Sequence, residues 1–156
     1  FHSAGPYIVA WASEGWNSWA ACQKYGGGPQ CEIYPKCRFK IVNTATGSQG
    51  TVNVDCFGTE KRLNEGMRRL IVSPMGAIAW LEENWKTKSV NTLFAVRFAV
   101  RKNALVGKVE RLDEGRANSG GLIDPSSLEF DGLNLTWRRV SESRTLFSGA
   151  SATLRD

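Results

Sequence analysis

The strongest constraint on the fold is a pair of segments, residues 37–43 and 51–56, in which apolar and polar side chains alternate. A period of two places successive residues on opposite faces of a β-strand. If Cys37 faces Cys56, the apolar residues of both strands share one face and Thr46-Gly47 forms the turn. The same register pairs Phe39 with Val54, Ile41 with Val52, Arg38 with Asp55, Lys40 with Asn53 and Val42 with Thr51. The sequence therefore predicts an antiparallel hairpin in this register.

Further segments rich in β-branched and aromatic residues are bounded by Gly, Pro, Asn or Asp, a pattern typical of strands. They are residues 7–11, 69–72, 92–102, 105–112, 128–137 and 143–154, the last two with expected bends at Gly132 and Gly149. We therefore expect one mainly β domain over residues 1–156, either an antiparallel β-sandwich or a β-roll or barrel. About 7–8 strands and room for one short helix are expected, with an α+β fold as the alternative.

A second hairpin is predicted from residues 94–101 and 105–112. Phe94, Val96, Phe98 and Val100 form one apolar face, which leaves Arg97 and Arg101 on the other side. This pattern is typical of an antiparallel sheet with one face in water.

The segment from Ser73 to Trp85 fits two structures. Ser73 could cap a helix that begins at Pro74, and Met75, Ile78, Leu81 and Trp85 recur at helical spacing. Gly76 and the two glutamates near the end oppose a helix. We favour a short helix and keep a strand as the alternative.

Four cysteines lie in the first third of the chain: Cys22, Cys31, Cys37 and Cys56. An even number in one short stretch is typical of disulfides formed in an oxidising compartment. Zinc sites use closer cysteine pairs and often histidine, so we predict disulfides and no metal site. The hairpin register favours a Cys37–Cys56 bridge and leaves Cys22–Cys31 as the second. The expected location is extracellular, with the periplasm as the alternative.

Candidates for catalysis are few. The only histidine is His2, and the chain contains no phosphate-binding loop, dinucleotide fingerprint, serine elbow or zinc-protease motif. Paired carboxylates could serve a glycosidase, and the candidates are Glu14, Glu82, Glu83, Glu110, Asp113 and Glu114. We favour a role without catalysis and predict no cofactor. No apolar run is long enough to span a membrane.

Aromatic residues indicate binding more strongly than catalysis. Trp11, Trp16, Trp19 and Tyr25 gather in one polar, glycine-containing stretch, and flat aromatic rings stack on sugars and anchor protein interfaces. The alternative is that these rings fill the core. Arg97 and Arg101 add positive charge to a chain with a formal net charge of +5. Basic and acidic residues alternate, so we rank nucleic acid last among the partners.

These observations favour a secreted, disulfide-stabilised interaction protein, such as an effector, a toxin-like protein or a module that binds a cell-surface protein or glycan. The alternative is a carbohydrate-binding module or a small glycan-directed hydrolase, with the tryptophan cluster as its platform.

Overall fold

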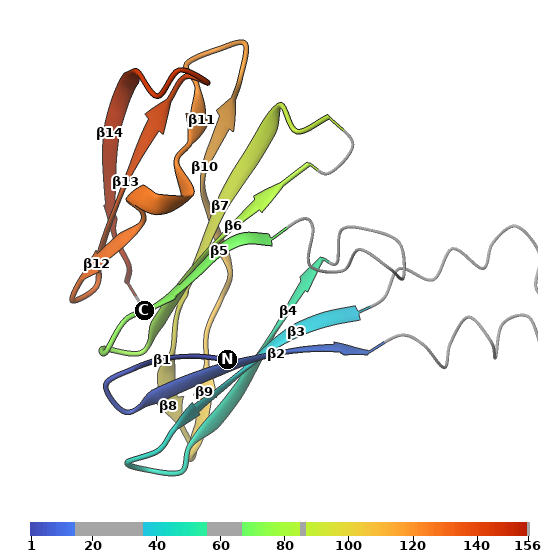
Figure 1. The fold of residues 1–156 in the computed structure, drawn as a ribbon. Helices are drawn as coiled ribbons and strands as arrows, with labels where there is room; N and C mark the ends of the chain where they lie inside the picture. Colours follow the sequence, from blue (N-terminus) through green and yellow to red (C-terminus); the bar gives the residue numbers. More distant parts are fainter. Residues whose placement is uncertain (15–35, 56–66, 85–86, 156) are drawn as a thin grey trace, which may run out of the picture.

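The structure, a computed structural model, describes residues 1–14, 36–55, 67–84 and 87–155. Within these residues the chain forms strands β1 to β14 and one short 3-10 turn, η1 (Figure 1). The strands build three sheets in which nearly all pairings are antiparallel. The prediction of a mainly β, sandwich-like fold is confirmed, although the strands are shorter and more numerous than expected.

The first sheet, sheet A, has the order β1-β2-β3-β4-β9-β8. Its strands are β1 (His2–Ala4), β2 (Tyr7–Glu14), β3 (Lys36–Asn43), β4 (Gln49–Asp55), β8 (Ala99–Arg101) and β9 (Ala104–Val106). The parallel contact in this sheet joins β4 to β9, where Gln49 pairs with Ala104. Gly50 permits this approach, because a Cβ there would lie 2.2 Å from the Leu105 carbonyl oxygen.

Two four-stranded sheets complete the fold. Sheet B has the order β10-β7-β6-β5, and in sheet C β13 lies between β14 on one side and β11 and β12 on the other. Sheet B contains β5 (Met67–Val72), β6 (Ala77–Glu83), β7 (Val90–Arg97) and β10 (Glu110–Arg116). Sheet C contains β11 (Leu122–Ile123), β12 (Glu129–Asp131), β13 (Asn134–Val140) and β14 (Leu146–Thr153), with η1 (Pro125–Ser127) between β11 and β12.

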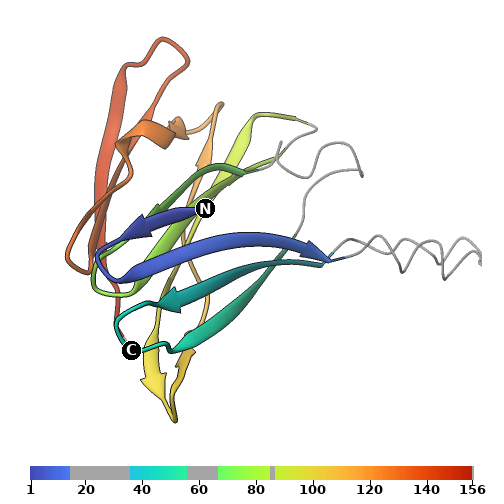
Figure 2. The same ribbon diagram turned by 60° about the horizontal axis from the view of Figure 1, so that its bottom comes forward.

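Sheet B is the middle layer, with sheet A on one side and sheet C on the other (Figure 1 and Figure 2). Two apolar cores fill the two interfaces. The core towards sheet A contains Val9, Phe39, Ile41, Val52, Leu70, Ile78, Trp80 and Val96, among others. The core towards sheet C contains Ala77, Ala79, Leu81, Leu93, Ala95, Ile123, Leu135 and Trp137, among others. A middle sheet therefore needs apolar residues on both of its faces.

This two-sided burial explains why the helix favoured at Ser73–Trp85 is wrong. Residues 77–83 form β6, and Ala77 to Glu82 are all buried. Alternate residues face opposite cores, so the strand lacks the polar face that would have identified it. Ser73 lies in the preceding turn instead of capping a helix, and its hydroxyl accepts a hydrogen bond from the backbone of Met75 at 3.1 Å.

The hairpin of β3 and β4 forms as predicted, but the predicted register is wrong by two residues. Cys37 lies opposite Val54, and Phe39 lies opposite Val52. The turn is centred earlier because the Asn43 side chain accepts hydrogen bonds from the backbone of Ala45 and Thr46. A shift of two preserves the faces. Cys56 lies outside the described residues, so the Cys37–Cys56 bridge stays a prediction. The register no longer supports this bridge, because Cys37 faces Val54.

The second predicted hairpin is confirmed as one long ribbon that passes from sheet B to sheet A. Its two outer strands, β7 and β10, pair in sheet B, and its two inner strands, β8 and β9, pair in sheet A. The tip is a two-residue turn in which both residues, Lys102 and Asn103, have positive φ. The expectation of one wet face is wrong for β7, because Leu93 and Ala95 are buried on the side opposite Val96.

Of the two predicted bends, only the one at Gly132 is present. Gly132 has a φ of 61° and lies in the turn between β12 and β13. Gly149 pairs with Arg138 inside β14, which continues without a break.

Candidate functional site

The free edge of sheet C is formed by β14. Among the described residues β14 pairs only with β13, from Asn134–Thr153 at one end to Val140–Leu146 at the other. Its second edge therefore presents backbone N–H and C=O groups that no described strand occupies. Such a row is a template for another extended chain.

No charged residue and no proline occurs in β14, whose sequence is LFSGASAT. The other long edges differ: β10 carries five charged residues between Glu110 and Arg116, and β5 carries Arg68 and Arg69. The remaining edges of sheet A, β1 and β8, have three residues each. Charge and shortness are the usual means of protecting an edge from pairing. Among the end strands of the three described sheets, β14 has neither.

The side chains of β14 are open to solvent over nearly the whole strand. Leu146 is 58% exposed and Phe147 is 56% exposed. Phe147 is the additional residue of a β-bulge, because Arg139 pairs with Ser148 while Val140 pairs with Leu146. The Phe147 ring lies over Gly121, where a Cβ would approach it to 2.6 Å. The Phe147 ring therefore lies across β13 towards β11, and Leu146 is the exposed apolar residue at this end of β14.

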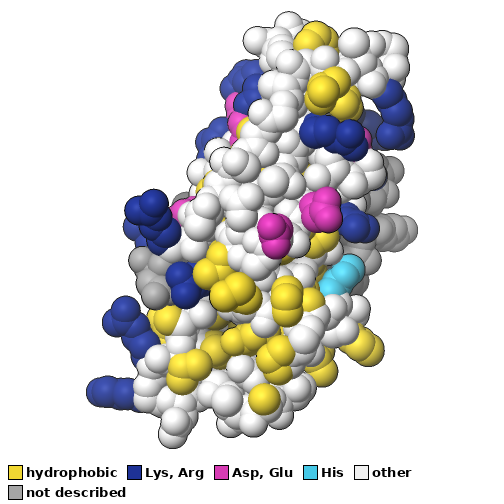
Figure 3. Space-filling model, turned by 90° about the vertical axis from the view of Figure 1, so that its left-hand side faces the viewer, with side chains coloured by type: hydrophobic (Ala, Val, Ile, Leu, Met, Phe, Trp, Pro, Cys, Tyr) yellow, Lys and Arg dark blue, Asp and Glu magenta, His cyan; other side chains and the backbone are white. Residues whose placement is uncertain are grey.

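A shallow groove runs beside β14 on sheet C. It has a volume of about 740 Å³ and is lined by hydroxyl-bearing and charged side chains of η1, β12, β13 and β14, including Ser127, Thr136, Arg138 and Ser151. Figure 3 shows this side of the molecule, where uncharged surface lies between groups of Lys and Arg. The groove therefore lies over β13, on the side of β14 away from its free edge.

A cluster around Asp113 anchors β13, the only described partner of β14, to the middle sheet. The Trp137 indole donates to Oδ2 of Asp113 at 2.7 Å, and the Arg139 guanidinium donates to both carboxylate oxygens. Burial by itself raises the pKa of Asp113, but the hydrogen bonds from Arg139 and Trp137 lower it below its ordinary value. The same contact raises the pKa of Arg139. A charged, hydrogen-bonded pair therefore holds the strand that carries the free edge.

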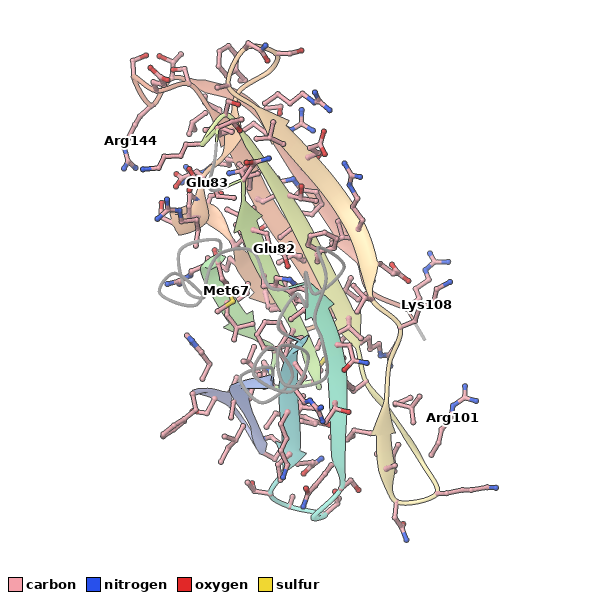
Figure 4. All side chains as sticks on the ribbon, turned by 90° about the vertical axis from the view of Figure 1, so that its right-hand side faces the viewer. Met67, Glu82, Glu83, Arg101, Lys108 and Arg144 are labelled. Atoms are coloured by element: carbon pink, nitrogen blue, oxygen red, sulfur yellow. The ribbon has the colours of Figure 1, made fainter. Side chains whose placement is uncertain are left out.

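A separate pocket of about 290 Å³ lies between sheets B and C. Arg68 of β5 pairs with Glu83 of β6 on one side. Asp124 lies on another side and accepts hydrogen bonds from the backbone and the hydroxyl of Ser126. Arg144, in the turn between β13 and β14, completes the charged lining. Figure 4 places Arg144 near Glu83, at the end of the molecule opposite Arg101.

The predicted aromatic binding cluster lies largely outside the described residues, so its role stays a prediction. Trp16, Trp19, Tyr25, Cys22 and Cys31 lie in residues 15–35, outside the described residues. Trp11 pairs with Phe39 in β2, and nothing beyond this backbone register is described for it. Arg97 ends β7 in sheet B and is partly buried, whereas Arg101 ends β8 in sheet A and is exposed. The ribbon therefore carries one arginine in each of the two sheets that it joins.

The candidate carboxylates whose contacts are described hold neighbouring side chains. Glu82 is buried and accepts a hydrogen bond from the Trp80 indole at 2.8 Å, and Glu114 pairs with Arg111 and Arg116. Within the described residues no group of three or more His, Cys, Asp or Glu side chains could hold a metal ion. In that same part of the chain no helix is long and apolar enough to cross a membrane.

The sequence analysis missed the free edge of β14. The available signal was the absence of charged residues between Arg144 and Arg155. Comparison of the chain with models of protein families, with curated proteins and with solved structures found no match. The function is therefore argued from the geometry of this structure.

Proposed function

We propose that this chain is an interaction domain that binds an extended polypeptide segment along β14. The observation that carries this proposal is an eight-residue edge without charge, proline or a described partner strand. Main-chain hydrogen bonds along such an edge supply affinity, and side chains at alternate positions supply specificity. Leu146 would contact an apolar residue at one end of the bound strand.

The four cysteines indicate the compartment in which this binding domain works. Cysteines in even number are typical of domains that work in oxidising compartments, so we place the protein outside the cell, or in a periplasm, with its cysteines in disulfides. In this proposal the protein is a secreted interaction protein whose partner is a cell-surface or extracellular polypeptide.

The test is a selection of peptides from a random displayed library on the purified chain, followed by backbone amide exchange with one selected peptide. We expect the peptide to slow exchange at those β14 amides that do not bond to β13. The variant Ala150→Lys places a charge at the centre of the edge and should weaken binding by about tenfold or more. Thermal unfolding of the variant checks that the fold is retained, since Ala150 is exposed.

Val106→Lys is the matched control. Val106 is 50% exposed and lies in β9, whose two neighbours in sheet A are β4 and β8. This variant adds the same charge away from β14 and should bind the peptide as the unmodified chain does. Protection confined to other strands, or equal loss in both variants, would overturn the proposal.

A further inference from the structure

The pocket between sheets B and C is built by side chains from distant parts of the sequence. Arg68 and Glu83 come from the ends of β5 and β6, Asp124 from the segment after β11, and Arg144 from the turn after β13. Leu122, Ile123, Pro125 and Val140 add an apolar portion to the lining. The pocket thus combines charged, planar side chains with an apolar surface.

The charges of this pocket balance. The guanidinium groups of Arg68 and Arg144 oppose the carboxylates of Glu83 and Asp124. Glu142 adds a third carboxylate, and Arg138, with its guanidinium 4.0 Å from Asp124, adds a third cation nearby. A strongly charged ligand would meet repulsion from one of these sets. A neutral ligand that both donates and accepts hydrogen bonds would meet partners of both kinds.

Arg144 has capacity for such a ligand. Its guanidinium interacts electrostatically with the carboxylate of Asp124. No described residue accepts a hydrogen bond from this guanidinium. Its backbone has a φ of 61°, a strained conformation for a residue with a side chain. The turn nevertheless holds an arginine beside the pocket. Asp124 remains an acceptor, because hydrogen bonds from Ser126 and the charges of Arg144 and Arg138 outweigh its burial and lower its pKa.

We propose that this pocket binds a neutral saccharide. Adjacent hydroxyls of a sugar ring each donate and accept, so they can bridge a carboxylate and a guanidinium, while the C–H face of the ring packs on apolar side chains. Asp124 and Glu83 would accept from the hydroxyls, Arg144 and Arg68 would donate to them, and Pro125 and Val140 would contact the ring. This site is independent of the peptide edge proposed for β14.

The test is titration of the isotope-labelled chain with a panel of neutral mono- and disaccharides, followed by amide chemical shifts. We expect one sugar to shift the amides of Ala117, Ser141 and Arg144 in a saturable manner. Arg144→Gly removes the guanidinium and relieves the positive φ, so it should weaken sugar binding by about tenfold without loss of stability. Arg101→Ala, at the opposite end of the molecule, should leave binding unchanged.

Several results would overturn the saccharide proposal. They are the absence of saturable shifts with every neutral sugar, shifts only with inorganic phosphate or acidic sugars, or equal weakening by Arg101→Ala. The peptide assay on the same Arg144→Gly protein separates the two proposals, because the guanidinium is not part of the β14 edge. Arg144→Gly should keep its peptide affinity. If the unmodified chain binds its peptide but no sugar, only the pocket is contradicted, and if it binds sugar but no peptide, only the edge is contradicted.

Discussion

Trp80 makes three contacts in the middle sheet's core towards sheet A, and the contact with Phe39 crosses between the two sheets. It is 1% exposed, its ring meets Phe39 edge-on at 5.1 Å and stacks with Phe94 at 5.6 Å, and its indole N–H donates to the buried Glu82. Aromatic pairs contribute beyond the area that they bury, and a lost hydrogen bond to a buried carboxylate costs more than one at the surface.

Trp80→Phe should therefore lower the free energy of unfolding by about 2–4 kcal/mol, from lost packing and a lost charged hydrogen bond. Urea unfolding followed by circular dichroism measures this value. Trp137→Phe is a second variant in the other core, where the indole also donates to a carboxylate, Asp113. A loss below 0.5 kcal/mol at Trp80, an ordinary value for a surface substitution, would show that this ring is not central to the core.

Asp113 makes stability depend on pH. Its pKa is lowered in the folded protein, so its contribution is present above the unfolded value of about 3.9 and is lost as the pH falls through the folded pKa. Asp113→Asn should cost about 1–3 kcal/mol near neutral pH and should flatten the decline of stability below about pH 4.

Thermal unfolding of Asp113→Asn and the unmodified chain between neutral pH and about pH 2.5 measures this difference. Asp131→Asn, at an exposed site on β12, is the control for removal of one carboxylate. If Asp131→Asn flattens the loss of stability at low pH as much as Asp113→Asn does, this loss cannot be assigned to Asp113.

At the scale of elements, two glycines differ in what their strands require. A Cβ at Gly50 would overlap the Leu105 carbonyl and separate β4 from β9, whereas a Cβ at Gly149 in β14 would meet nothing within 4 Å. Neither residue has a positive φ. The two glycines therefore differ in the space that is available for a Cβ atom.

Gly50→Ala should lower the free energy of unfolding by about 1–3 kcal/mol, since the strands must move apart. Gly149→Ala should be neutral or stabilise by about 0.4–1 kcal/mol, because it restricts the unfolded chain without strain in the folded one. Chemical unfolding of both variants measures the contrast. Equal effects would contradict the described approach of β9 to β4.

At the scale of the whole molecule, β14 is an uncharged end strand that no other described strand covers. Two neighbouring copies can pair their β14 strands, so the chain should self-associate as its concentration rises, in the absence of a peptide partner. Sedimentation equilibrium should show this association, and Ala150→Lys should reduce it. Equal reduction of self-association by Val106→Lys would show that two copies do not associate through β14.

The assignment of strands depends on local periodicity, and so does the assignment of residues to faces. Phe39, Ile41 and Val52 were predicted on one face of a hairpin, and all three lie in the core between sheets A and B. The register was wrong by two residues, because the hydrogen bonds that Asn43 accepts set the turn, and a shift of two leaves every face unchanged.

The sequence by itself determined the β class, most strand positions and the inward faces of β3 and β4, whereas Val100, expected on the apolar face of the ribbon, is 55% exposed at its tip. These depend on a period of two that neighbouring residues express. Only the tertiary structure decided that β6 is a buried strand and that β14 is a free edge. Both properties depend on which sheets lie beside a strand, and β6 has a sheet on each face whereas β14 has a described neighbour on one edge. The candidate binding edge follows from that position, because the uncharged sequence of β14 matters only where no other strand covers it.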